Sequence, residues 1–555
     1  MKKLILPLLL LVSELGFAQL MAGKTHGFTR ADSLRGTLSP ERTCYDVRFY
    51  DLNIDVDIAK RYIAGYNTIR FSVLKDFDRM QVDLFDNMNV DRIVWNGKEL
   101  NYTREFNAVF ISFPEQLKSG QNAEIQFFYS GNPVVARKAP WDGGFVFSKD
   151  KAGNDWVGVA CQGTGASLWW PNKDHQSDEP DSMLITVKVP DGYMNVSNGR
   201  LRDQQKEKKT RKTSYTWFVA NPINNYDVTL NIAKYAHFSD TYTSADGSSL
   251  SLDYYVLPEN LAKAKEQFQQ VIPMMTAFEK RFGKYPFYED GYKLVESPYL
   301  GMEHQSAVAY GNKYKNGYMG MDLSMTGEGK KFDYIIVHET AHEWWGNSIT
   351  SADIADMWIH EGFGQYAEAV YLEEVYGQES AFKYLNGLKN GVGNKKPIIG
   401  PYGVNKEGSG DMYPKGALLL HTLRGVINND ELWWKIIYGI STDFRHQVVT
   451  TQQIEDYISS RSGMDLKPVF DQYLRNANIP VLELKFAEKG KDTELEYRWV
   501  TDVASFRMPV ELLVGGKRRR LTPGNDFQKM TLKDVKKENV QADKSRFYIK
   551  EKISE

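Results

Sequence analysis

The chain has 555 residues and a mass of 63.6 kDa, with 42% hydrophobic, 25% charged and 13% aromatic residues. A length several times that of one domain and a near-average composition exclude a single small binding module, a disordered chain and a collagen-like repeat. The 69 basic and 71 acidic residues nearly cancel, which gives no support for a nucleic-acid surface, and two cysteines are too few for a disulfide scaffold or a cysteine-rich metal module.

The N-terminus has the pattern of a secretory signal peptide. Two lysines follow Met1, an apolar run extends from Leu4 to Val12, and small residues end at Ala18. The run is about half as long as a membrane span requires, and no later segment is apolar enough to cross a bilayer. We therefore expect a signal peptide over residues 1–18, export to the periplasm or the medium, no membrane span, and a polar segment over residues 19–42.

A β-rich domain is predicted over residues 43–245. Polar and apolar residues alternate without a slip from Asp51 to Ile58, which is typical of a strand with one buried face. Further short alternating segments follow, separated by glycine, asparagine, aspartate and proline turns. The two cysteines, Cys44 and Cys161, lie in this domain and form one disulfide bond at most.

The apolar period becomes helical after Glu259. Apolar residues recur on one helical face until Gly283, and the region up to residue 478 is mostly of this kind. Alternation returns after Pro480, which predicts a small β-sandwich over residues 479–555. The prediction is therefore a multidomain α+β fold, in which a mostly helical domain over residues 246–478 stands between two β domains.

One segment of the helical domain has the spacing of a metal site. His338 and His342, four residues apart, share one face of a helix, and Glu339 beside them is placed to reach a water molecule on a shared ion. Apolar residues precede the pair, so the helix should be buried, where two histidines without a shared partner are costly. Two satisfied core histidines are the alternative. A catalytic zinc also needs a third protein ligand, for which Glu361, 18 intervening residues after His342, is the candidate.

At these residues the chain resembles the M1 family of zinc aminopeptidases, which includes aminopeptidase N and leukotriene A4 hydrolase. The family signature is His-Glu-x-x-His, 18 residues and then Glu, and the spacing matches residue for residue. The resemblance implies one zinc ion per chain, held by His338, His342 and Glu361, with Glu339 as general base and then general acid. It also implies a saddle-shaped β domain, a thermolysin-like catalytic domain and a β-sandwich, in a short form without the family's C-terminal helical domain.

The resemblance further implies a site for the α-ammonium group of a substrate. The family provides a carboxylate from a Gly-x-Met-Glu-Asn strand, and Leu300-Gly301-Met302-Glu303-His304 stands at the matching place, with Leu300 and His304 as departures. Glu303 would hold the amine, and Gly301 and Met302 beside it are assigned to substrate binding. Gln162, nine residues before a Pro-x-x-Asp segment, is assigned by the same resemblance to the amino end of the substrate.

A tyrosine before a Glu-Lys-Gly run stabilises the oxyanion in the family. The segment Met412-Tyr413-Pro414-Lys415-Gly416 matches, with Pro414 in place of the Glu, so the resemblance implies that role for Tyr413. The expected function is hydrolysis of the N-terminal peptide bond of peptides with a free N-terminus. Two alternatives stay open: a zinc endopeptidase of the thermolysin type, which has no amine anchor, and a non-catalytic peptide-binding protein on the same fold. The sequence does not indicate the oligomeric state.

Overall fold

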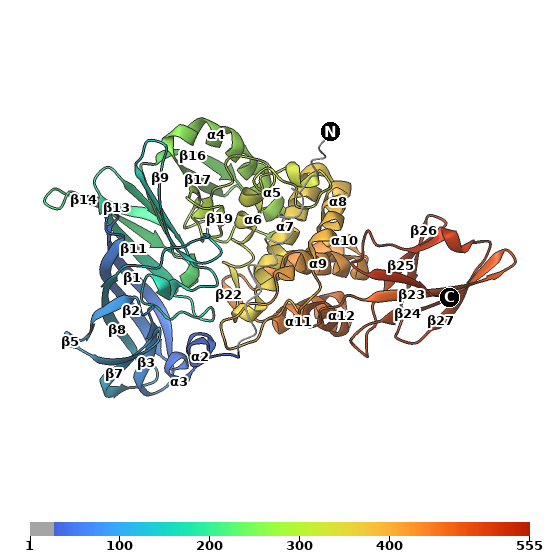
Figure 1. Cartoon of the computed structure of the whole chain (residues 1–555), viewed down its shortest axis with the longest axis horizontal. Helices are drawn as coiled ribbons and strands as arrows, with labels where there is room; N and C mark the ends of the chain where they lie inside the picture. Colours follow the sequence, from blue (N-terminus) through green and yellow to red (C-terminus); the bar gives the residue numbers. More distant parts are fainter. Residues whose placement is uncertain (1–26, 555) are drawn as a thin grey trace, which may run out of the picture.

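The computed structural model describes residues 27–554, so the predicted signal peptide lies outside the described residues. Three regions follow one another along the long axis: a β-rich region, a block of helices and a small β region (Figure 1). The predicted multidomain α+β fold is confirmed. Within residues 27–554, no helix combines the length and the apolar character that a membrane crossing requires.

An eight-stranded sheet is the largest element of the N-terminal region. Its strands, in spatial order, are β13 (Arg200–Glu207), β14 (Lys212–Val219), β11 (Ser182–Pro190), β1 (Tyr45–Asp57), β2 (Tyr62–Val73), β8 (Asn122–Gly131), β4 (Met88–Trp95) and β5 (Lys98–Glu99). β1 pairs in parallel with β11 and antiparallel with β2. The residues from Asp51 to Ile58 alternate between half-buried and buried positions, because one face of the sheet packs against the core.

Two smaller sheets complete this region. Their strands are β12 (Met194–Ser197), β15 (Leu230–Ala233), β10 (Asp155–Ala160) and β9 (Gly144–Lys149) in one, and β3 (Phe77–Asp83), β7 (Ala108–Leu117) and β6 (Asn101–Glu105) in the other. Two short helices, α2 (Arg30–Gly36) and α3 (Pro40–Thr43), precede the first strand. Cys44 and Cys161 are both buried and free, so they form no disulfide bond. Because β10 ends at Ala160, the chain leaves the sheet two residues before Gln162.

A five-stranded sheet joins the β-rich region to the helices. Its strands, in spatial order, are β16 (Ala236–Thr243), β17 (Ser249–Val256), β18 (Tyr292–Glu296), β20 (Val308–Tyr310) and β19 (Gly301–Met302). The domain boundary expected at residue 245 falls between β16 and β17, which pair with each other in this sheet. β19 lies at the sheet edge, antiparallel to β20, and Glu303 follows it directly.

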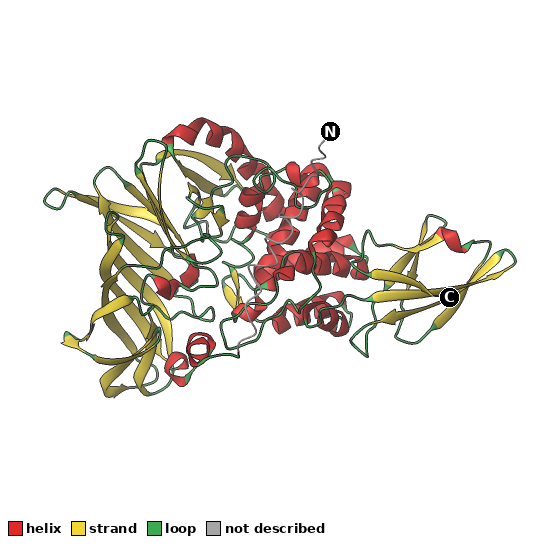
Figure 2. Cartoon of the chain, in the orientation of Figure 1, coloured by secondary structure: helices red, strands yellow, loops and turns green. Residues whose placement is uncertain are grey.

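The central region is mostly helical (Figure 2). Its helices are α4 (Leu261–Gln267), α5 (Val271–Phe282), α6 (Tyr334–Ala341), α7 (Trp358–Tyr376), α8 (Gln378–Leu388), α9 (Pro414–Ile427), α10 (Asp430–Asp443), α11 (Thr451–Ser462) and α12 (Lys467–Leu474), with a strand pair β21 (Ile349–Ser351) and β22 (Gln447–Val449). Gly283 ends α5 with a φ of 82°, a conformation that favours glycine. α6 is buried along its whole length and packs against α7, so polar side chains between them are shielded from water.

The C-terminal region consists of two sheets. Their strands are β27 (Gln528–Leu532), β24 (Asp492–Val500), β23 (Val481–Lys489) and β29 (Lys550–Ser554) in one, and β26 (Lys517–Leu521), β25 (Val510–Val514) and β28 (Val540–Ala542) in the other. Trp499 of the first sheet and Leu512 of the second belong to one apolar core, which is continuous with the core of the helical region. The C-terminal region therefore packs against the helices on the side opposite the N-terminal sheets (Figure 1).

Candidate active site

Two histidines lie at the end of helix α6. Asp333 caps the start of the helix, since its carboxylate accepts hydrogen bonds from the backbone amides of Ile335 and Ile336 at 3.1 and 3.4 Å. His338 is in the helix and His342 at its C-terminal end. Their Nε2 atoms are 3.3 Å apart and both side chains are buried. The helical spacing thus brings the two rings to one point.

Glu361 reaches the same point from helix α7. Its Oε2 atom lies 3.5 Å from Nε2 of His338 and 3.4 Å from Nε2 of His342, and the residue is 2% exposed. Gly362, the next residue, packs on Gly416 of α9. A Cβ atom added to Gly416 would lie only 2.7 Å from the Cα atom of Gly362. The two glycines let α7 and α9 approach closely, which brings the start of α9 to the site.

Both imidazoles are held through their other ring nitrogen. Nδ1 of His338 is 2.8 Å from Oε1 of Glu368, and Nδ1 of His342 is 2.9 Å from the carbonyl oxygen of Trp345. Tyr384 also donates a hydrogen bond to Glu368. Because a carbonyl oxygen and a carboxylate accept, we assign a proton to Nδ1 of each ring. In the neutral imidazoles, both Nε2 atoms then present lone pairs.

Three electron-pair donors therefore converge in a buried site. Their separations of 3.3–3.5 Å match the ligand atoms of a tetrahedral zinc ion, which lie about 3.4 Å apart at bond lengths of about 2.0–2.1 Å. Oε2 of Glu361 has no hydrogen-bond partner among the described residues. Burial lowers the pKa of His342, yet Glu361 and Glu303 raise it to about 9, so the surroundings favour positive charge. His338, His342 and Glu361 fit a zinc ion.

A second carboxylate, Glu303, lies beside this group. It is 2% exposed, and its Oε1 atom accepts hydrogen bonds from the Gln162 side-chain amide and, at 3.2 Å, from the Tyr226 hydroxyl. Nε2 of Gln162 is also 3.3 Å from Oε1 of Glu361. Burial raises the pKa of Glu303 to about 7, and the nearby Glu361 adds to the shift. A cation bound beside Glu303 would therefore stabilise the ionised carboxylate of this residue.

Glu339 lies between the histidines and strand β19. A Cβ atom at Gly301 would be 2.8 Å from Oε1 of Glu339 and 2.8 Å from Cγ2 of Ile335, so glycine lets the strand lie this close to α6. Burial raises the pKa of Glu339, which suits a group that accepts and returns a proton. Met302, the next residue of the strand, has a buried side chain in the N-terminal core.

Tyr413 precedes helix α9 and faces the histidines. Its ring is nearly parallel to that of His338, at an interplanar angle of 22° with the ring centroids 6.0 Å apart. Burial raises the pKa of Tyr413 well above its usual value, and Glu361 and Glu407 add to the shift. The phenol therefore keeps its proton and is a hydrogen-bond donor.

Two further histidines near the site, His304 and His360, are buried and neutral. Burial lowers the pKa of His304 and of His360 to about 3. Nε2 of His360 accepts a hydrogen bond from the Ser351 amide at 2.9 Å, whereas neither ring nitrogen of His304 has a partner among the described residues. Neither ring belongs to the convergent donor group in the described part of the chain.

Two residues of the site, Tyr226 and Glu368, were not assigned from the sequence. Glu368 lies seven residues after Glu361, which is about two helical turns, so the helical period of α7 could have found it. Tyr226 lies in a short 3₁₀ turn of the N-terminal region, and no motif marks it. It meets Glu303 only because the two regions pack together.

Comparison with known proteins identifies the family of the helical region. Residues 266–473 match the Peptidase family M1 domain. The chain contains an M1 peptidase domain. The resemblance inferred from the sequence motifs is thereby confirmed. The M1 domain includes the three convergent donors, Glu303 and Tyr413, whereas Gln162 comes from the N-terminal region.

The relatives and solved structures that resemble the chain include proteins that extend beyond the M1 domain on both sides. The chain is 21% identical to leucyl aminopeptidase from Saccharolobus solfataricus over 90% of this chain, and spans 63% of that protein. An M1 zinc metallopeptidase from Deinococcus radiodurans, solved with a Tyr-Ser-Ala substrate, covers 80% of this chain and 98% of its own, at 19% identity and a TM-score of 0.66. Aminopeptidase A from Legionella pneumophila, in complex with aspartic acid, covers 92% of this chain and 60% of its own, at 16% identity and a TM-score of 0.76. The structural likeness shows a shared fold.

Proposed function

We propose that this protein is a zinc-dependent aminopeptidase, a hydrolase that removes the N-terminal residue of peptides with a free amino group. The observation that carries the proposal is the buried Glu303 carboxylate beside the donors of His338, His342 and Glu361. The side chains of Gln162 and Tyr226 donate hydrogen bonds to this carboxylate, and neither carries a positive charge. The α-ammonium group of a peptide supplies the cation that this position favours.

We assign a task to each side chain from its position. Zinc held by His338, His342 and Glu361 would acidify a water molecule and polarise the peptide carbonyl group. Glu339 accepts the proton of the attacking water and transfers it to the leaving amine.

Two further side chains complete the mechanism. Tyr413 donates a hydrogen bond to the carbonyl oxygen as negative charge develops on it. Glu303, with Gln162, holds the α-ammonium group, so that the first peptide bond of the substrate is the one positioned for attack.

Zinc, one ion per chain, is the proposed cofactor. Dialysis against a chelator should abolish hydrolysis of an unblocked amino-acid p-nitroanilide, and one equivalent of zinc should restore it. His342→Ala should lose the bound metal measured by plasma mass spectrometry. His237→Ala changes an exposed histidine of β16 and is the matched control. A His342→Ala protein that retains one zinc per chain would contradict this assignment.

A zinc endopeptidase is the second candidate, because the donor group and Glu339 would serve it equally well. The amine anchor argues against it, since an endopeptidase must accept a mid-chain residue where Glu303 lies. A non-catalytic peptide-binding protein is the third candidate. The simultaneous presence of Glu339 and Tyr413 at the donor group favours catalysis.

We also propose that the protein is exported to the periplasm or the medium. The support is the signal-peptide pattern of residues 1–18. N-terminal sequencing of the protein from its native host should find a mature chain that begins at Gln19, in the extracytoplasmic fraction. A cytoplasmic protein that begins at Met1 would contradict the proposal.

A further inference from the structure

The loop before helix α9 connects two parts of the proposed substrate site. Residues 398–412 lead directly to Tyr413. Within this loop, Nδ2 of Asn405 donates a hydrogen bond to the carbonyl oxygen of Gly163 at 3.1 Å. Gly163 follows Gln162, which donates to Glu303. The loop therefore extends from the amine anchor to the hydroxyl that faces the histidines.

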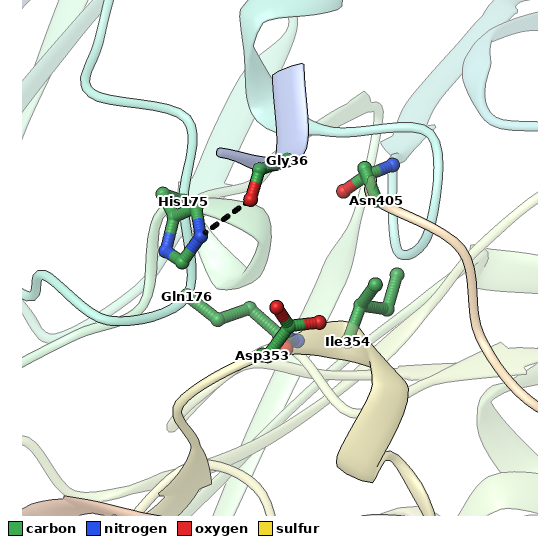
Figure 3. A pocket seen from close by; sticks show the side chains of 6 residues that line it. All are labelled: Gly36, His175, Gln176, Asp353, Ile354 and Asn405. Atoms are coloured by element: carbon green, nitrogen blue, oxygen red, sulfur yellow. Dashed lines mark hydrogen bonds between the residues drawn. The ribbon is translucent and has the colours of Figure 1, made fainter. Parts of the chain in front are cut away.

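The loop is held in place on both sides. Figure 3 shows Asn405 beside a small pocket that Gly36 of helix α2 also lines. The Gly400 amide donates to the carbonyl oxygen of Ala355 at 2.9 Å. A Cβ atom on Gly400 would lie 2.8 Å from the carbonyl carbon of Glu407, so the two arms of the loop are in close contact. The backbone of Glu407 thus has a defined position in the loop that leads to Tyr413.

Glu407 is an unpaired carboxylate on this loop. It is half-buried and forms no hydrogen bond or ion pair with any residue that the structure describes. The preceding Lys406 is engaged elsewhere, with its ammonium nitrogen 5.6 Å from the ring centroid of Phe28. Burial, and to a lesser extent Glu361, raises the pKa of Glu407 to about 7, and Glu407 contributes to the raised pKa of Tyr413. The carboxylate therefore lies within electrostatic range of the site.

We propose that Glu407 binds the cationic side chain of an N-terminal arginine or lysine, so that the enzyme prefers substrates whose first residue is basic. This inference rests on the proposed function. The other carboxylates of the site have other tasks: Glu303 holds the α-ammonium group, Glu361 the metal, and Glu339 the proton. A long basic side chain extends from the Cα atom held by Glu303 and ends in a charge that needs a carboxylate. Glu407 forms no hydrogen bond or ion pair with the described residues, so its carboxylate is available to pair with that charge.

The test compares substrates that differ in charge at the first residue. Wild type and Glu407→Gln are assayed with arginine, lysine and methionine 7-amido-4-methylcoumarins, because methionine is an unbranched neutral match. We expect wild type to cleave the basic amides with a kcat/KM about fivefold above that of the methionine amide, the upper end of what one partly exposed charge pair contributes. Glu407→Gln should remove this ratio. The control Glu379→Gln, an exposed position on α8, should keep it.

Charge reversal gives a second readout. Glu407→Lys should shift the preference toward aspartate and glutamate amides. A ratio of basic to neutral kcat/KM that is the same in wild type and in both variants would overturn the proposal.

A binding measurement separates failure of the subsite from failure of the proposed function. If the zinc-loaded protein hydrolysed none of the amides, the proposed function would fail. Calorimetry with argininamide and methioninamide then decides the inference on Glu407. Tighter binding of argininamide that Glu407→Gln abolishes supports it, and equal binding of the two amides overturns it.

Discussion

Nδ1 of His338 lies 2.8 Å from Oε1 of Glu368, two helical turns beyond Glu361 on the same helix. One face of α7 thus provides both Glu361, one of the three convergent donors, and Glu368, the carboxylate that orients His338. Tyr384 from α8 donates to the same carboxylate and fixes it. Such partners set the tautomer and the ring orientation of a metal-binding histidine.

The first prediction concerns this carboxylate. Glu368→Gln should weaken zinc binding about 10- to 100-fold, because the neutral amide no longer stabilises the proton on Nδ1 of His338. Competition with a chromophoric chelator measures the affinity. Glu379→Gln on the exposed face of α8 should leave it unchanged. An unchanged zinc affinity of Glu368→Gln would show that this contact does not tune the metal site.

The second prediction concerns the proton. Glu339→Gln should lower kcat by about 10²–10⁴-fold, because the amide cannot accept a proton from water. Zinc content should stay at one per chain, since Glu339 is not one of the three convergent donors. Steady-state kinetics together with metal analysis check both statements. A kcat within a few-fold of wild type would assign the proton transfer to another group.

The third prediction concerns the oxyanion. Tyr413→Phe removes one hydroxyl and keeps the ring that stacks on His338. We expect kcat to fall about 10²- to 10³-fold while KM changes little, since the hydrogen bond strengthens as charge develops on the carbonyl oxygen. Steady-state kinetics on a single dipeptide separate the two constants. A loss expressed only in KM would instead place Tyr413 in ground-state binding.

The fourth prediction concerns stability. Arg42 is fully buried and donates hydrogen bonds to Oδ2 of Asp83 and to the carbonyl oxygen of Arg35, both at 2.6 Å. Arg42→Ala leaves the Asp83 carboxylate buried without its cation, which should lower the free energy of unfolding by about 3–5 kcal/mol. Chemical denaturation measures the change. Arg48→Ala removes two exposed ion pairs, with Asp46 and Asp181, and should cost less than about 1 kcal/mol. Equal effects of the two variants would contradict the account.

Local periodicity explains what could be predicted from the sequence. The alternation from Asp51 to Ile58 predicts a half-buried strand, and β1 is one. The four-residue spacing of His338 and His342 on a helix requires their rings to share a face, and their Nε2 atoms lie 3.3 Å apart. The spacing between His342 and Glu361 could be interpreted only through the family resemblance, because a segment that is not α-helical separates α6 from α7.

Contacts between distant segments explain what could not be predicted. Tyr226 reaches Glu303 across 77 positions of sequence, and Asn405 reaches Gly163 across 242. No periodic pattern in either segment encodes such a pairing. The change of period after Glu259 likewise does not reveal that β16 and β17 share a sheet with β18, because sheet membership depends on packing of segments far apart in the chain.

The amine anchor is the central claim, and one measurement tests it most directly. Release of free amino acids is followed from unblocked and N-acetylated versions of one short peptide library, with and without a zinc chelator, for wild type and Glu303→Ala. We expect chelator-sensitive release from the unblocked peptides alone, and its loss in Glu303→Ala. Cleavage of N-acetylated peptides that does not depend on Glu303 would contradict the aminopeptidase account and identify an endopeptidase.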